Sequence, residues 1–230
     1  MTGQTGADPF SDPNELFDVY DNAGHPTGRV KRRAEVHRDG DWHRSFHCWV
    51  TCDDSAARAT AGAGPALLLQ RRGRHKDTWP GRLDVSVGGH YRAGETLSDV
   101  VREVEEEIGQ ATRLEELLPL GHRVCVNEQE PGTLDHELQD VFLWPSSLPL
   151  SAFRPQPVEV TALEAASVPD LLRLLSGQTA SIRVRVLRPD LGMEDGAITA
   201  NDFIPTFDRY FYRVAMLVDL AGRGYPHLVV

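Results

Sequence analysis

The segment at residues 88–109, GGHYRAGETLSDVVREVEEEIG, constrains the fold more than any other part of the sequence. After Gly88 and Gly89 the pattern changes from the two-residue period of a strand to a helical period. A helix turns about 100° per residue, so Glu103, Glu106 and Glu107 share an arc of about 100°. An apolar stripe that can pack on a sheet lies beside them and consists of Leu97, Val100, Val101, Val104 and Ile108. The segment therefore predicts a strand-to-helix corner whose helix is apolar on one side and acidic on another.

Three carboxylates at three- and four-residue spacing repel one another, at a cost of a few tenths of a kcal/mol per pair. A divalent cation would offset that cost, because Mg²⁺ and Mn²⁺ prefer oxygen ligands. The alternative is a solvated acidic face, which is the usual role of a charge run on a helix. The glycine pair favours ligand binding, since glycine lets the backbone approach a ligand closely. We therefore expect Glu103, Glu106 and Glu107 to bind Mg²⁺ or Mn²⁺.

The spacing of these residues resembles the Nudix box, in which Gly is followed after five residues by Glu and later by Arg-Glu-apolar-x-Glu-Glu-x-Gly. The matching residues are Gly89, Glu95, Arg102, Glu103, Val104, Glu106, Glu107 and Gly109. The family places seven residues between the first Glu and the Arg, whereas this chain has six. The resemblance implies a catalytic role for Arg102, which Glu95 helps to orient. The shortened link would shift that contact or let Asp99 join the acidic face.

The flanking sequence resembles one branch of the family more closely. The stretches AEVHRDGDWHRSFHCWV, LLLQRRGRHKDTWPGRLDVSVGGH and DHELQDVFL look like the Nudix branch related to isopentenyl diphosphate isomerase, over residues 16–175. That resemblance implies a second metal site at His37, His43, His90 and Glu137, with Asp135 as a further candidate. A lone histidine is more often a surface or core residue than a ligand, but imidazole does suit a transition metal.

A basic stretch follows the apolar run at residues 65–71 and includes Arg71, Arg72 and Lys76. Planar Arg forks and a Lys point charge can hold a diphosphate, whereas the alternative is a solvated basic loop. The matched position in the resembling families favours phosphate binding. We therefore expect these three residues, with the backbone of Gly88 and Gly89, to bind substrate.

The bulk composition bounds the partners and the compartment. A formal net charge of −10 argues against a nucleic-acid polymer and leaves a small anionic molecule as the partner. The sequence has no apolar run of the roughly 18 to 20 residues that cross a bilayer, and its start lacks the pattern of a secretion signal. Three cysteines, an odd number, fit free thiols in a reducing compartment, so we expect a cytoplasmic protein and buried, structural roles for Cys48 and Cys52.

The chain divides by composition into a flexible tail (residues 1–14), a Nudix domain (residues 15–176) and a C-terminal extension packed on the core (residues 177–230). The pattern predicts strands at residues 16–20, 45–52, 65–71, 83–87, 121–126 and 139–144, and helices at residues 168–175 and 202–220. The predicted fold is an α/β Nudix-like α/β/α sandwich around a mixed β-sheet, with a C-terminal helical extension. The apolar final helix could cover the core or form a dimer contact, and we expect a homodimer.

These observations predict a metal-dependent hydrolase that cleaves a diphosphate linkage in a small molecule, such as a nucleoside diphosphate derivative. Bound Mg²⁺ would neutralise phosphate oxygens and lower the pKa of the attacking water. One alternative is an enzyme like isopentenyl diphosphate isomerase, but the cysteine that this isomerase needs two residues before the matched histidine is Gly88 here. Another is a nucleotide-sensing module without catalysis, although such a module would be expected to lose helix carboxylates. The proton of the water would pass to Glu106, Glu107 or Glu137.

Overall fold

The structure is a computed structural model that describes residues 12–54, 66–76, 78–129 and 133–230. Its first half begins with two strands and a short helix. Four further strands and the helix that carries the acidic residues follow. These elements are β1 (Leu16–Tyr20), β2 (Pro26–Arg32), α1 (Arg33–Asp39), β3 (Trp42–Cys52), β4 (Ala66–Arg72), β5 (Leu83–Asp84), β6 (Val87–His90), α3 (Leu97–Val100) and α4 (Arg102–Ile108). The predicted strands at residues 16–20, 45–52 and 65–71 are confirmed, whereas residues 83–87 form two separate short strands.

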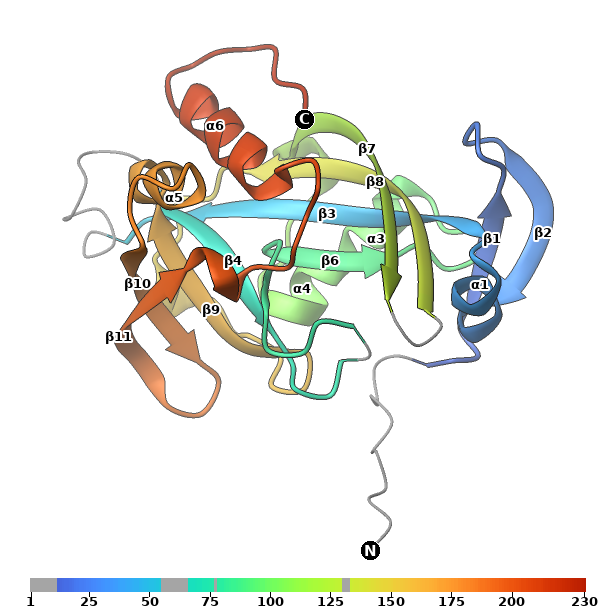
Figure 1. The fold of residues 1–230 in the computed structure, drawn as a ribbon, viewed down its shortest axis with the longest axis horizontal. Coiled ribbons are helices and arrows are strands. Elements are labelled where there is room, and N and C mark those ends of the chain that lie inside the picture. Colours follow the sequence, from blue (N-terminus) through green and yellow to red (C-terminus); the bar gives the residue numbers. More distant parts are fainter. Residues whose placement is uncertain (1–11, 55–65, 77, 130–132) are drawn as a thin grey trace, which may run out of the picture.

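The second half alternates strands with short helical turns and ends in a helix (Figure 1). Its elements are η1 (Leu114–Glu116), β7 (Leu118–Gln129), β8 (Thr133–Trp144), η2 (Leu150–Ala152), β9 (Val160–Ser167), α5 (Val168–Leu175), β10 (Ser181–Arg188), β11 (Gly192–Thr199), η3 (Ala200–Asp202) and α6 (Tyr210–Gly222). Helix α5 has the predicted bounds, because Ser167 caps its start and Pro169 occupies its first turn. The predicted final helix begins eight residues later than expected, at Tyr210.

Strand β3 is the axis of the sheet, whose order is β11-β10-β9-β4-β3-β1-β2. Along one edge β3 runs parallel to β8, and its other pairings are antiparallel, so the sheet is mixed. Residues 45–48 of β3 pair with β6, while residues 51–52 pair with β4. The strands β4 and β6 therefore leave β3 at different points, and a side chain from a covering helix can reach between them.

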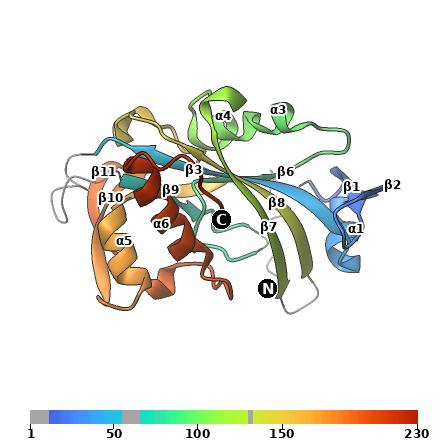
Figure 2. The ribbon, with the colours of Figure 1, turned by 90° about the horizontal axis from the view of Figure 1, so that it is seen from above.

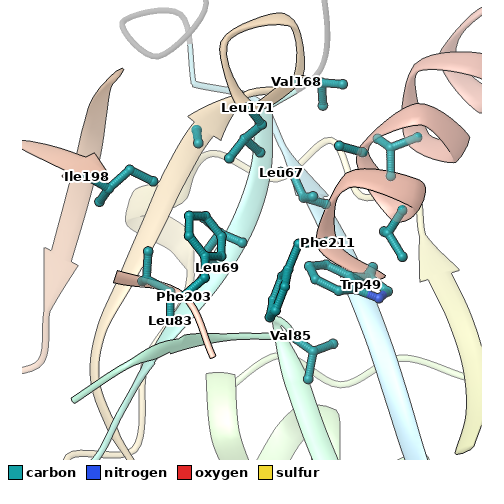
Figure 3. Packing of buried hydrophobic residues seen from close by; sticks show 14 of the residues in the cluster. Trp49, Leu67, Leu69, Leu83, Val85, Val168, Leu171, Ile198, Phe203 and Phe211 are labelled. Atoms are coloured by element: carbon teal, nitrogen blue, oxygen red, sulfur yellow. The ribbon is translucent and has the colours of Figure 1, made fainter. Parts of the chain in front are cut away.

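Helices cover both faces of the sheet, with α3 and α4 on one side and α5 and α6 on the other (Figure 2). A core beneath α4 includes Phe46, Val104 and Ile108. A second core lies beneath α5 and α6 and includes Trp49 and Phe211 (Figure 3). The α/β/α sandwich predicted from sequence is confirmed.

The C-terminal extension contains the predicted helix, α6, and also the β10–β11 hairpin, which was not predicted. Ile182, Val184 and Val186 of β10 are buried on the core, while Arg183 is exposed between them. This alternation is a two-residue strand period and was available in the sequence. The extension thus adds strands to the sheet as well as a helix over one of its faces.

Candidate functional site

Glu107 of α4 is the most deeply placed carboxylate of the acidic helix. Its side chain is 2% exposed, and its Oε2 accepts hydrogen bonds from Nε2 of Gln70 at 2.6 Å and from the backbone N–H of Gly88 at 3.3 Å. Gln70 belongs to β4 and Gly88 to β6, so the carboxylate fills the gap where the two strands diverge. Burial, followed by the negative charges of Glu159 and Glu103, raises the pKa of Glu107 well above its ordinary value.

Glu103 lies one turn earlier, against the backbone of Gly89. A Cβ atom at Gly89 would lie 2.5 Å from Cδ of Glu103, so only glycine leaves room for this carboxylate. Burial raises the pKa of Glu103 to about 7, against the opposing charge of Arg102. Glu106 is more open, with a side chain that is 49% exposed. The three carboxylates therefore differ in solvent exposure, which increases from Glu107 through Glu103 to Glu106.

Arg102 joins these carboxylates to Glu95. Its guanidinium donates to Glu95 at 3.0–3.2 Å, to Glu106 at 2.8 Å and to Glu103. The Glu95–Arg102 contact forms despite the one-residue shortening, and Val101 stands between the end of α3 and the start of α4. Asp99 does not join the acidic face and instead accepts from the backbone N–H and hydroxyl of Thr96.

Two residues that sequence reasoning missed complete this carboxylate cluster. Gln70 donates to Glu107, and Glu159 is an acidic neighbour that contributes to the raised pKa values of Glu103 and Glu107. Nζ of Lys76, predicted to bind phosphate, lies 2.9 Å from Oε2 of Glu159. No local motif marked Gln70 or Glu159, because both reach the cluster only through contacts between segments far apart in the chain.

The two arginines predicted to bind phosphate, Arg71 and Arg72, point to different places in the structure. Arg72 lines the main cavity and is held by Asp84 at 2.7 Å and by Thr78 at 3.0 Å. Arg71 contacts Glu164, the carbonyl of Gly81 and Asp202 instead, and it does not line that cavity. Alternate residues of a strand point to opposite faces, which explains why neighbours on β4 diverge. Substrate binding by Arg72 and by Arg71 remains a prediction.

A second cluster contains every residue of the predicted second metal site. His37 comes from α1, His43 from β3 and His90 from β6, while Asp135 and Glu137 lie on β8. One donor atom from each histidine and one from Asp135 lie within 4.8 Å of one another. His90 Nε2 lies 3.0 Å from Oε1 of Glu137. Four separate elements thus bring these side chains to one point.

The chemistry of the donor atoms fits a metal ion. Among the described residues, Nε2 of His37, Nε2 of His43 and Oδ1 of Asp135 are buried without a hydrogen-bond partner, whereas Nε2 of His90 faces Glu137. Three such atoms at one point are costly unless something binds them. Nδ1 of His43 donates to the carbonyl of Asp41 at 3.1 Å, which leaves its Nε2 lone pair free for coordination. Coordination through Nε2 of His90 would place that ring's proton on Nδ1, so the Arg33 guanidinium, 3.0 Å away, would have to turn.

The surroundings lower the pKa values of His37 and His90 and raise that of His43. Burial, together with the charge of neighbouring His90, lowers the pKa of His37 to about 2, and burial lowers the pKa of His90 to about 3. Burial also acts to lower the pKa of His43, but the contact with Asp135 outweighs it and leaves the value raised. Neutral imidazole is the form that binds metal, so His37 and His90 are prepared as ligands over the physiological pH range.

A cavity of about 550 Å³ joins the histidine cluster to the C-terminal part of the chain. Its lining includes His37, His90, Asp135 and Glu137 at one end. Gly88 and Gly89 also line it, and their other side contacts Glu107 and Glu103. The carboxylate cluster and the histidine cluster therefore lie on either side of strand β6. A ligand in this cavity would contact the residues between them.

Other sequence predictions concern cysteines and membranes. Cys48 and Cys52 are buried in the core beneath α4, as expected of structural cysteines. Among the helices of the described residues, none is both long and apolar enough to span a membrane.

Comparison with known proteins identifies the family. Residues 43–185, more than half of the chain, match the NUDIX domain. An uncharacterized Nudix hydrolase from Clostridium acetobutylicum is 33% identical over 71% of this chain and 75% of its own length. The chain therefore belongs to the Nudix family. It is a Nudix-type hydrolase acting on a diphosphate substrate.

Further relatives agree with the sequence resemblance. Nudix hydrolase 3 of Arabidopsis thaliana is 36% identical over 70% of this chain, although the match spans only 20% of that protein. The isopentenyl-diphosphate Delta-isomerase of Brevibacterium linens is 32% identical over 68% of this chain and 79% of its own length. The crystal structure of DR0079 from Deinococcus radiodurans has a TM-score of 0.51 at 21% identity, covering 71% of this chain and 90% of that one, and it shows the shared fold.

Proposed function

We propose that this protein is a metal-dependent hydrolase that cleaves a diphosphate linkage in a small molecule. The observation that carries the proposal is the complete acidic helix. Glu107 is buried beside Gly88, Glu103 is half-buried against Gly89, and Arg102 bridges Glu95, Glu103 and Glu106. Glu107 in particular is a buried carboxylate with a raised pKa whose hydrogen bonds come from the neutral donors Gln70 and Gly88, and such a carboxylate is typical of a cation site. A sensing module would have no need to retain all three.

The carboxylates Glu103, Glu106 and Glu107 would hold Mg²⁺ or Mn²⁺, and the histidine cluster would hold a transition metal. When bound, such ions neutralise phosphate oxygens and make water a better nucleophile. Arg102 fixes the carboxylates in place, and Arg72 lies where it can donate to phosphate oxygens from the cavity wall.

The reaction forms one bond between a water oxygen and phosphorus and breaks the bond from phosphorus to the bridging oxygen. The bridging oxygen leaves with the second phosphate, and a carboxylate accepts the proton of the water. Glu106 is our candidate for that acceptor, because it is the most exposed of the three, whereas Glu107 already accepts two hydrogen bonds.

The isomerase is the second candidate, and the histidine cluster together with the Brevibacterium linens relative favours it. It requires a thiol and a carboxylate on opposite sides of the substrate. Gly88 stands where the resembling enzyme has its thiol. Cys125 does line the cavity, but it lies directly opposite Glu137 in the β7–β8 pairing, so the two side chains project from the same face. This placement disfavours isomerisation.

The deciding experiment incubates the protein with Mg²⁺ or Mn²⁺ and a panel of diphosphates, beside the Glu106→Gln and Glu107→Gln variants. The panel contains nucleoside diphosphates and triphosphates, dinucleotides, nucleotide sugars, coenzyme A and isopentenyl diphosphate. We expect metal-dependent release of phosphate or nucleotide that both variants lose. Conversion of isopentenyl diphosphate into its isomer without release would establish the isomerase, and binding without turnover would establish a sensor.

A further inference from the structure

A segment outside the matched NUDIX domain closes one end of the cavity. Residues 204–211 connect η3 to α6 and follow the end of the family match at residue 185. Of these eight, all but Arg209 line the cavity, opposite the histidine cluster. The cavity is therefore lined partly by the matched domain and partly by a segment that follows it in the chain.

This segment is fixed to the domain by a network that also reaches the histidine cluster. Arg123 of β7 donates two hydrogen bonds to Asp208, at 2.7 and 3.0 Å, and its guanidinium lies 4.1 Å from the ring centroid of Tyr210. The same Arg123 donates to Gln139 at 2.6 Å, and Gln139 in turn donates to Glu137. The wall is thus held rigidly enough to select a ligand by shape.

Two aromatic side chains at this end lack partners of their own. Phe207 is fully exposed, with an accessibility of 106%, although it lines the cavity. Trp79 lines the same cavity, and its indole Nε1 is buried without a hydrogen-bond partner. A buried N–H donor without an acceptor is costly, so a ligand atom that accepts a hydrogen bond would complete this site.

The backbone at these positions is also unusual. Within the part of the chain that the structure describes, Trp79 and Arg209 are the non-glycine residues with left-handed backbone, at φ of 49° and 55°. Such conformations cost free energy and concentrate where a side chain must be aimed for function. Trp79 lines the cavity, and Arg209 directly joins Asp208 to Tyr210, which both line it.

The two ends of the cavity suit two parts of one molecule. Arg33 bonds to His90 at the end of the histidine cluster, which suits phosphate, and Arg72 is held by Thr78 next to Trp79. Trp79 and Phe207 suit a planar ring that stacks. A purely aliphatic tail has no acceptor for the Trp79 N–H and would leave it unsatisfied. Asp84 and Asp208 in the lining are also unfavourable surroundings for an aliphatic chain.

We propose that Trp79 and residues 204–211 form the specificity subsite for the group beyond the diphosphate, and that this group is a planar heteroaromatic ring with a hydrogen-bond acceptor. Phe207 stacks on the ring, and the Trp79 N–H donates to it. The inference rests on the proposed function in that the diphosphate occupies the other end of the cavity. It identifies the determinants of specificity by residue: Trp79 lies inside the matched domain and residues 204–211 lie outside it.

The test measures binding by calorimetry in the presence of Mg²⁺, using uncleavable ligands so that turnover is not required. The ligands are ADP with a methylene-bridged diphosphate, methylene diphosphonate without a ring, and a prenyl methylene diphosphonate. We expect Phe207→Ala and Trp79→Phe each to weaken binding of the ADP analogue about tenfold, in the range of a lost stacking or hydrogen-bonding contact. Binding of methylene diphosphonate should stay within about twofold.

Tyr225→Ala is the matched control, because it removes an exposed aromatic side chain of the same C-terminal region that does not line the cavity. It should bind all three ligands like the wild type. The inference is wrong if the wild type does not bind the ADP analogue, if Phe207→Ala weakens both phosphonates equally, or if the prenyl ligand binds more tightly and depends on Phe207. Ring-dependent binding without hydrolysis of any diphosphate would instead refute the proposed function and leave the subsite standing.

Discussion

Gly88 and Gly89 of strand β6 pack directly against two glutamates of α4. Gly89 has no Cβ because the Glu103 side chain occupies that space, and the N–H of Gly88 donates to Glu107. The sequence suggested that the glycines let a ligand approach the backbone. The structure shows that they first admit the carboxylates, and substrate contact remains a prediction.

At this scale we expect Glu103→Gln to lower kcat by about 100-fold or more, which is the effect typical of losing a charged catalytic group. Burial destabilises the charged form of Glu103. The uncharged Gln in the Glu103→Gln variant should therefore leave the urea unfolding midpoint at or above the wild-type value. Steady-state kinetics and urea titration of the same samples measure both. Glu105→Gln, an exposed change on the same helix, should alter neither, and a comparable loss of kcat in both variants would remove the special role of Glu103.

The histidine cluster yields a prediction that does not depend on activity. His43→Gln removes the Nε2 atom that the Asp41 carbonyl holds ready for coordination. In protein reloaded with Zn²⁺ beside excess Mg²⁺, this change should lower the Zn²⁺ content from about one equivalent to a small fraction of it. Elemental analysis after chelation and reloading measures the content. His25→Gln, at an exposed histidine, is the control. Equal metal content in the two variants would show that the cluster does not hold the ion.

Among the elements, β9 and the β10–β11 hairpin show two different reasons for missed strands. Strand β9 reads VTALEAAS, and its alanines and buried Glu164 have weak strand propensity. It is a strand because β4 and β10 pair with it on both edges, and because Arg71 pairs with Glu164. Pairing with distant strands makes β9 a strand. In β10 the alternation of apolar and polar residues is a strand pattern visible in the sequence, but the prediction did not use it.

The segment that leads into α6 should make stability depend on pH. Burial opposes ionisation of Asp208, but the hydrogen bonds and charge of Arg123 outweigh it and lower its pKa below the ordinary value of 3.8. A carboxylate with a lowered pKa stabilises the fold above the unfolded-state pKa and loses that effect as the pH falls through the folded-state value. The stabilisation is therefore complete near pH 7, begins to fall near the unfolded-state pKa of about 4, and is lost below the folded-state pKa.

Asp208→Asn removes this titrating group. Urea unfolding at pH 7 should show the variant less stable by about 1 kcal/mol, as for a partly exposed ion pair. The difference between wild type and variant should shrink as the pH is lowered from 5 to 3. A difference that stays constant or grows over that range would contradict the assignment to Asp208.

At the scale of the whole molecule, the boundary drawn from composition at residue 176 crosses a single core. Trp49, Leu67 and Leu69 belong to the shared domain, yet they pack in one cluster with Ile198 and Phe211 (Figure 3). Each buried aliphatic or aromatic side chain of this kind contributes about 1.5–3 kcal/mol. Loss of several of them exceeds the net stability of an ordinary domain.

We therefore expect a fragment of residues 1–176 to lack cooperative unfolding, whereas the full chain unfolds in one transition. Circular dichroism in the near and far ultraviolet, followed through a urea titration, should give coincident curves for the full chain. The fragment should show no near-ultraviolet signal of packed aromatics. A cooperatively folded fragment would establish residues 177–230 as a separate appendage.

The sequence by itself determined the helix that carries Glu103, Glu106 and Glu107, because helical periodicity and fixed spacing are local properties that a linear pattern records. The predicted strand-to-helix corner at Gly88 and Gly89 is wrong, since both glycines lie inside β6 and the first following helix begins at Leu97. The resemblance added His37, His43, His90 and Glu137, which no local pattern would have joined. Only the tertiary structure decided that Gln70 and Glu159 complete the carboxylate cluster and that residues 204–211 wall the cavity. These contacts depend on strand pairing and packing between residues far apart in the chain, and such long-range contacts leave no periodic trace in the sequence.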